Sequence, residues 1–128
     1  MGEKLLVDVW VADLSPTINH LWKSRKFGAK LYKSPEGKAW QDMCALILRN
    51  AATLQEPYTG NVRAEYTFQS KSRRKWDVDN RVKASQDCLA MAGIILDDKQ
   101  IIKFSAERTQ GPADATRIVV YAIEGECP

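Results

Sequence analysis

Residues 77–98 read DVDNRVKASQDCLAMAGIILDD, and this stretch indicates where one helix of the fold begins and ends. Small and apolar residues recur in it at helical spacing, which predicts a helix over about residues 80–92 with one face toward a core. Either Asp79 or Asn80 can serve as its N-cap, and Gly93 is a natural left-handed stop. The apolar run after Gly93 is suited to a buried strand or a strand-like connector.

Five aspartates surround one lysine within this stretch. In chain order these residues are Asp77, Asp79, Lys83, Asp87, Asp97 and Asp98. If residues 77–79 are extended, Asp77 and Asp79 point to one side while Val78 faces the core. The apolar connector would return Asp98 to the start of the helix. Converging carboxylates repel one another unless a cation lies between them, and such hard oxygen ligands suit Mg²⁺.

A basic segment lies directly before these carboxylates. Its cations are Lys71, Arg73, Arg74 and Lys75. Positive side chains can hold phosphates while carboxylates hold Mg²⁺ against the phosphate to be cleaved, so the combination predicts a metal-dependent enzyme that acts on nucleic acid. The alternative is a charged loop that only faces water, which is the usual role of a charge run.

Two familiar sites are excluded by spacing. An EF-hand also begins Asp-x-Asp, but it needs Gly at loop position six and Glu at position twelve, where this chain has Val82 and Cys88. The seven glycines are scattered and none precedes a Gly-Lys-Ser/Thr sequence, so we expect no P-loop and no nucleotide cofactor.

The spacing of these residues resembles the signature of the RusA family of Holliday junction resolvases. The matching string is Asp77-x-Asp79-Asn80-x-x-Lys83-x-x-x-Asp87, followed by Gly93 and then Asp97-Asp98-x-x-Ile101. Earlier in the chain, the segment 16–19 (Pro-Thr-Ile-Asn) is similar to a Pro-Ser-x-Asn turn of the family, with Thr for Ser. The segment 33–37 (Lys-Ser-Pro-Glu-Gly) is similar to the family's Ser-x-Glu-Gly helix opening.

The resemblance implies a small homodimeric endonuclease that uses Mg²⁺, with Mn²⁺ as the substitute cation. Such an enzyme resolves four-way DNA junctions by paired nicks during recombination and repair. The resemblance assigns metal binding and catalysis to Asp77, Asp79 and Asp98, and catalysis to Lys83. The remaining motif positions, interpreted as a supporting shell, are Asn80, Asp87 and Asp97.

A second basic segment, residues 22–33, contains no acidic residue. Its cations are Lys23, Arg25, Lys26, Lys30 and Lys33. These five and the four at 71–75 make nine of the nineteen lysines and arginines, so the net charge of +3 is unevenly distributed. We expect both segments to contact DNA. The aromatic residues within or beside them either stack on exposed bases or tether the loops to the core; they are Trp22, Phe27, Tyr32 and Trp76.

Length and composition limit the class of protein. A chain of 128 residues supports a single domain, 1–128, with a true core. Three cysteines (Cys44, Cys88 and Cys127) and one histidine (His20) are too few and too dispersed for a disulfide framework or a zinc site. This favours a reducing cytoplasm, in a bacterial cell or in the host of a phage. No apolar stretch is long enough to span a membrane.

Hydrophobic periodicity predicts the remaining elements. The expected strands are 5–12, 62–68, 100–108 and 116–124, the expected helices are about 34–55 and 80–92, and the expected loops are 13–33 and 109–114. On the first strand, Leu5, Val7, Val9 and Val11 would share the core face. This order predicts an α+β (α/β-like) domain with one mixed sheet covered by two main helices. So small a domain leaves apolar surface to bury, which favours a homodimer.

Alternatives remain at the level of function. A protein that binds DNA structures without cutting them would also need the basic surface, and would use the aspartates only for folding. A metal-dependent nuclease for flap or duplex DNA would have the same site and differ only in substrate. For Lys83, the alternative to catalysis is a salt bridge with Asp79 or Asp87, which is common at this spacing on a helix.

Overall fold

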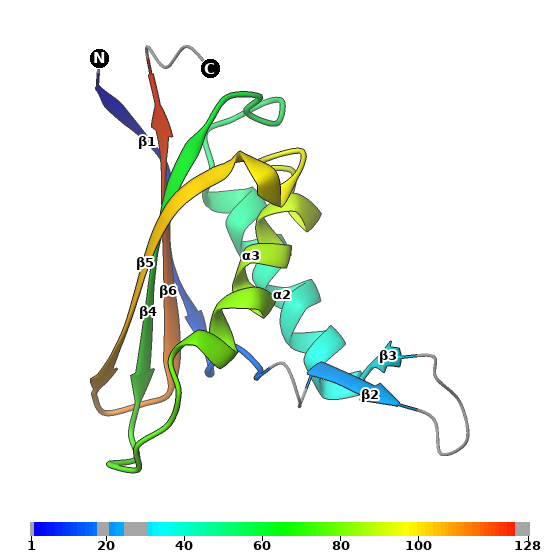
Figure 1. Ribbon diagram of the computed structural model, residues 1–128, viewed down its shortest axis with the longest axis vertical. Helices are drawn as coiled ribbons and strands as arrows, with labels where there is room; N and C mark the ends of the chain where they lie inside the picture. The colour runs from blue at the N-terminus through cyan, green and yellow to red at the C-terminus, as the bar shows by residue number, and fades with distance from the viewer. Residues whose placement is uncertain (1, 18–20, 25–30, 125–128) are drawn as a thin grey trace.

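The computed structural model describes residues 2–17, 21–24 and 31–124, and in it a four-stranded mixed sheet forms the body of the domain (Figure 1). The strands are β1 (Glu3–Ala12), β4 (Val62–Ser70), β5 (Ile101–Gln110) and β6 (Ala115–Ile123). Their order in the sheet is β1-β6-β4-β5, with β6 antiparallel to both neighbours and β5 parallel to β4. The predicted α+β domain with one mixed sheet is therefore confirmed.

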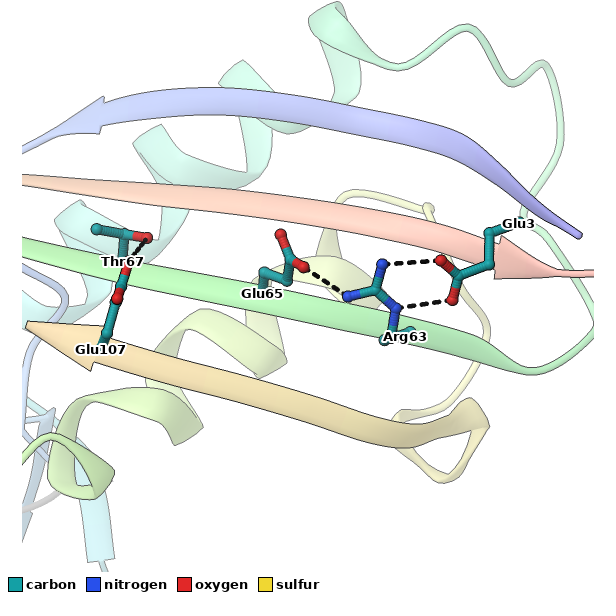
Figure 2. A network of polar contacts seen from close by, with 5 residues as sticks. All are labelled: Glu3, Arg63, Glu65, Thr67 and Glu107. Atoms are coloured by element: carbon teal, nitrogen blue, oxygen red, sulfur yellow. Dashed lines mark hydrogen bonds and ion pairs between the residues drawn. The ribbon is translucent and has the colours of Figure 1, made fainter.

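Two helices, α2 (Pro35–Ala51) and α3 (Val82–Met91), cover one face of this sheet (Figure 1). Alternate residues of β4, from Val62 to Phe68, are buried beneath them. The residues between point to the open face, where Arg63 bridges Glu3 and Glu65 (Figure 2). The helices thus leave the other face of the sheet uncovered.

Helix α2 begins as predicted and ends earlier than predicted. Ser34 is the N-cap, and its Oγ accepts a hydrogen bond from the Gly37 amide at 3.0 Å. The helix stops at Ala51 because Ala52 adopts an extended conformation, with ψ of 144°. Leu54 still packs against the core from the segment that follows, so the apolar pattern continued past the end of the helix.

A register shift in β1 changes which residues face the core. The pairing with β6 is irregular between Leu5 and Val7. Leu5 is 49% exposed, whereas the consecutive residues Leu6 and Val7 are both buried. The prediction that Leu5 faces the core was therefore wrong, since one extra residue in a strand reverses the alternation on one side of it. Val11 is buried as predicted.

The segment expected to be a long loop contains two short paired strands. β2 (Trp22–Ser24) pairs antiparallel with β3 (Leu31–Lys33), so the loop prediction was wrong for these residues. Lys33 lies at the end of β3. The predicted DNA contacts Arg25, Lys26 and Lys30, and the side chain of Lys23, lie outside the described residues.

The chain after α3 follows the prediction closely. Gly93 has a φ of 75°, which is the left-handed stop expected there. Ile95 then forms a parallel bridge with Tyr58, as a strand-like connector would. In the described part of the chain, no helix is long and apolar enough to cross a membrane.

Candidate active site

The segment directly before α3 is helical rather than extended. Val78 has helical dihedrals (φ −64°, ψ −42°), and Asp79–Arg81 form a single turn of 3₁₀ helix, η1. The prediction that Asp77 and Asp79 lie on one side of an extended segment was therefore wrong. Val78 packs against the core as predicted, but the turn begins at this residue, so the alternation of a strand ends here.

Helix α3 begins without a side-chain cap. The N-cap position belongs to Arg81, and neither Asp79 nor Asn80 fills the role predicted for it. Asp77 and Asp79 are exposed, and within the described residues their carboxylates make no hydrogen bond or ion pair. Both carboxylates are consequently accessible to a ligand from solvent.

Lys83 lies in the first turn of α3 and contacts two carboxylates. Its Nζ is 3.0 Å from Asp98 Oδ2 and 3.2 Å from Asp87 Oδ1. The hydrogen bond to Asp98 raises the pKa of Lys83, and the same bond lowers the pKa of Asp98. The ammonium and the Asp98 carboxylate are therefore both charged near neutral pH. The salt bridge to Asp87 that was the structural alternative for Lys83 is present as well.

Asp97 shapes the turn that carries Asp98. It caps the short 3₁₀ helix η2 (Asp98–Gln100), and its Oδ1 accepts from the Lys99 amide at 2.8 Å. Gln100 Oε1 accepts from the Asp97 amide, and Gln100 Nε2 donates to the Tyr58 carbonyl at 2.7 Å. The capping box, together with the bond from Gln100 to Tyr58, fixes the backbone of Asp98 against the segment between α2 and β4.

The structure does not gather the carboxylates as predicted. Over the described residues, no three acidic, cysteine or histidine side chains form a group that could hold a metal ion. Asp98 joins Asp87 and Lys83, while Asp77 and Asp79 lie at or before the start of the helix. The predicted ligands Asp77, Asp79 and Asp98 have the oxygen chemistry that Mg²⁺ requires. In this single chain, however, the group that lies against Asp98 is the ammonium of Lys83.

A buried network of hydroxyls ties the segment after β1 to the start of α3. Ser15 Oγ donates to the Arg81 carbonyl at 2.7 Å and accepts from Ser85 Oγ at 2.9 Å. The Ser15 amide donates to Thr116 Oγ1, whose hydroxyl donates to the Asp13 carbonyl at 3.0 Å. Ser15, Ser85 and Thr116 have no exposed surface. Sequence analysis missed these residues, because isolated small hydroxyl residues form no pattern.

Trp76, directly before Asp77, is held from several sides. The Arg81 guanidinium lies 4.6 Å from the centroid of the indole ring, and Phe68 meets the ring edge-on at 6.1 Å. Arg81 also donates to the Ser15 carbonyl at 2.7 Å, and its partial burial lowers its pKa. Trp76 is thus a tether to the core, one of the two roles considered for it.

Described residues from both predicted DNA-contacting segments lie near carboxylates. Lys33 lines a depression of about 360 Å³ together with Asp87, Asp98 and Leu96. The other segment follows β4 and is separated from Asp77 by Trp76 alone. Its exposed residues are Lys71, Arg73, Arg74 and Lys75. Lys33 is therefore a neighbour of Asp87 and Asp98 in space, and the segment 71–75 is a neighbour of Asp77 in the chain.

Comparison with known proteins gives matches to one family. Residues 13–121 match the family model described as endodeoxyribonuclease RusA. The chain is 32% identical over 89 residues to the crossover junction endodeoxyribonuclease RusA of Escherichia coli K12, which covers 70% of this chain and 72% of that protein. The corresponding proteins of Shigella sonnei and of Enterobacteria phage 82 are each 30% identical over the same shares. All the carboxylates and the lysine of the candidate site lie within residues 13–121.

Proposed function

This chain belongs to the RusA family of endodeoxyribonucleases, and we propose on that basis that it resolves four-way DNA junctions by paired nicks, in recombination and repair. The observation that carries the proposal is the Lys83 ammonium held between Asp87 and Asp98, beside exposed carboxylates and a basic segment. Relatives from bacteria and a phage support an activity on DNA in the bacterial cytoplasm.

We propose Mg²⁺ as the cofactor, with Mn²⁺ as its substitute, and Asp77, Asp79 and Asp98 as its ligands. Two observations support these ligands: all three side chains are exposed, and Asp77 and Asp79 have no other partner among the described residues. Asp98 would have to share or release its bond to Lys83. When bound, the ion would supply a polarised phosphate and a water of lowered pKa.

Lys83 is the residue that we propose acts directly on the phosphate. Its raised pKa keeps the ammonium charged, and Asp87 and Asp98 hold it at a defined position. A preorganised cation stabilises negative charge that develops on the reacting phosphate without first reorganising. Asp87 and Asp97 support this arrangement from either side, the first through the ion pair and the second through the turn at Asp98.

We propose that two copies of the chain act together. A four-way junction has approximate two-fold symmetry, and paired nicks require two sites. Large apolar side chains are exposed around the end of α3 and the start of β5, where a second copy could cover them. They are Met91, Leu96, Ile102 and Phe104. The molar mass in solution, measured by light scattering, tests this directly, and a monomer at the concentration of full activity would refute it.

Cleavage of three substrates tests the function. Synthetic four-way, flap and linear duplex DNA of matched sequence would be incubated with the protein and Mg²⁺, and again in EDTA. Resolution predicts symmetric nicks in the four-way substrate alone, with Mg²⁺. Equal cutting of flap or duplex would identify a less selective nuclease. Binding of the junction without any nick would identify a DNA-structure-binding protein.

A further inference from the structure

A groove of about 220 Å³ lies between the end of β4 and the end of β5, and Arg108 forms its β5 wall. The opposite wall is the basic segment, with Arg73, Arg74 and Lys75. Arg108 Nη1 donates a 2.7 Å hydrogen bond to the carbonyl oxygen of Trp76, the residue directly before Asp77. The groove therefore adjoins the chain that carries a proposed metal ligand. Sequence analysis missed Arg108, which lies alone among uncharged neighbours and one acid.

The walls of this groove are suited to an anion. Four cations line it, no carboxylate does, and Ser72 and Thr109 add hydroxyl donors. Within the described residues, the side chains of Arg73, Arg74 and Lys75 make no hydrogen bond or ion pair. Pockets for whole small molecules measure roughly 300–1,000 Å³. The groove is smaller, and a phosphate group suits it better than a nucleoside.

The backbone of the basic segment is held by its own hydroxyls. Ser70 Oγ accepts from the Ser72 amide, and Ser72 Oγ accepts from the Arg74 amide, each at 3.1 Å. The Gly111 amide donates to the Ser70 carbonyl at 3.1 Å, and this bond joins the chain after β5 to the end of β4. The cations consequently extend from an ordered chain, which lowers the entropy lost when they bind a ligand.

We propose that this groove binds a backbone phosphate of the DNA strand that is cut, close to the scissile phosphate, and that Arg108 links this phosphate to Asp77. The proposal rests on the proposed function and adds a subsite to it. A guanidinium has five N–H donors in a planar fork. One of them holds the Trp76 carbonyl, which leaves others for the phosphate. Arg108 is thus a DNA contact and also a positioning residue for Asp77.

Binding in EDTA, where no cleavage occurs, tests the contact. Affinity for a labelled four-way junction would be measured over a range of salt for wild type, Arg108→Ala and Arg108→Lys. Each lost phosphate contact should flatten the slope of log K against log salt by about one unit. We expect this for Arg108→Ala. The control is Arg117→Ala, which removes the same charge from the open face of the sheet, where Arg117 pairs with Asp8 at 2.7 Å; its slope should match wild type.

A scan with neutral methylphosphonate linkages locates the phosphate. We expect one linkage near the nick whose neutralisation weakens wild type but weakens Arg108→Ala no further. Arg74 lies on the opposite wall, and the affinity of Arg74→Ala should likewise be weakened no further by the same neutral linkage. This second variant keeps the test valid if Arg108→Ala folds poorly. If every neutral linkage weakens wild type and both variants by equal factors, the groove is not a phosphate site.

Single-turnover cleavage at saturating junction tests the link to Asp77. Arg108→Lys keeps the charge but not the fork, so we expect it to restore most of the affinity and little of the rate. A full rate in Arg108→Lys would overturn the positioning role. The proposed function and the phosphate site can fail independently. The proposed function is tested by whether the wild-type protein nicks the junction, and the phosphate site is tested by binding in EDTA.

Discussion

The Lys83 ammonium and the Asp98 carboxylate lie 3.0 Å apart although fifteen residues separate them in the chain. Lys83 lies in the first turn of α3, and the left-handed Gly93 turns the chain back after this helix so that η2 presents Asp98 beside the lysine. Asp87 completes the contact from the next turn of the helix. An ammonium placed between two carboxylates is held without being buried, and a ligand from solvent can still reach it.

Replacing Lys83 should separate catalysis from binding. We expect Lys83→Ala to lower the single-turnover rate roughly a hundredfold or more, the scale for losing a positioned electrostatic stabiliser. Junction affinity should change little, since one contact among many is lost. Lys83→Arg should retain affinity and stability but not rate, because a planar fork does not replace a compact ammonium.

The matched control for Lys83 is Lys38. Like Lys83 with Asp87, it pairs with an aspartate four residues along a helix, but this pair, with Asp42 at 3.0 Å, is on α2. Lys38→Ala should leave the rate unchanged. If Lys83→Ala lowers the melting temperature sharply and keeps its rate per folded molecule, Lys83 is only a structural partner of Asp87 and Asp98.

Replacing the exposed aspartates should abolish cleavage with little effect on the fold. Asp77→Asn removes a carboxylate that has no partner among the described residues, so the melting temperature in EDTA should be unchanged or slightly higher. Asp98→Asn loses the half-exposed ion pair with Lys83, and the cost should be at most about 1 kcal/mol. Circular dichroism melts and a nicking assay measure the two effects, with Asp42→Asn as the control. Nicking retained by both variants would refute the assignment of the metal ligands.

The coupling between Lys83 and Asp98 should depend on pH in a defined way. Lys83 lowers the pKa of Asp98 from its ordinary value of 3.8. The stabilisation from this carboxylate is therefore complete above pH 3.8 and is lost as the pH falls below that value. The pKa of Lys83 is raised by Asp98, so its contribution is complete below 10.5 and is lost as the pH rises above it. A double-mutant cycle followed by urea denaturation should give about 0.2–1 kcal/mol between these limits. A coupling that varies strongly between pH 5 and 9 would contradict this.

Local pattern predicted helix α3 and its ending, because the spacing of apolar residues and one glycine determine them. It failed at Val78, where an apolar residue between two aspartates suits an extended strand and a helical turn equally. Core packing of Val78 fits both, and the helical turn is accompanied by contacts with distant residues, such as the Ser15 hydroxyl on the Arg81 carbonyl, which are not visible in the sequence. The same limit explains Leu5, because an extra residue in one strand is defined only by its partner β6.

The family was predictable from the motif residues, but the geometry of the candidate site was not. The spacing of the aspartates and Lys83 was sufficient to identify the family, and the matching residues lie in the region that its model covers. Ser15 and Ser85 meet across 70 residues, and Arg108 reaches Trp76 across 32. Single hydroxyls or a single arginine give no periodic signal, so only the fold reveals these contacts.

The buried hydroxyl network should link stability to the site. Ser85→Ala removes the donor to Ser15 Oγ in a fully buried place, and we expect it to lower the free energy of unfolding by about 1–3 kcal/mol. Thr116→Val should act similarly, because the Ser15 amide and the Asp13 carbonyl both lose their partner. Ser105→Ala, on the exposed part of β5, is the control and should change stability by no more than about 0.5 kcal/mol.

Since Ser15 also holds the Arg81 carbonyl at the start of α3, cleavage per folded molecule should fall in both buried variants. Urea denaturation and single-turnover nicking measure the two quantities. A loss of stability with an unchanged rate would show that the network supports the fold without positioning the site.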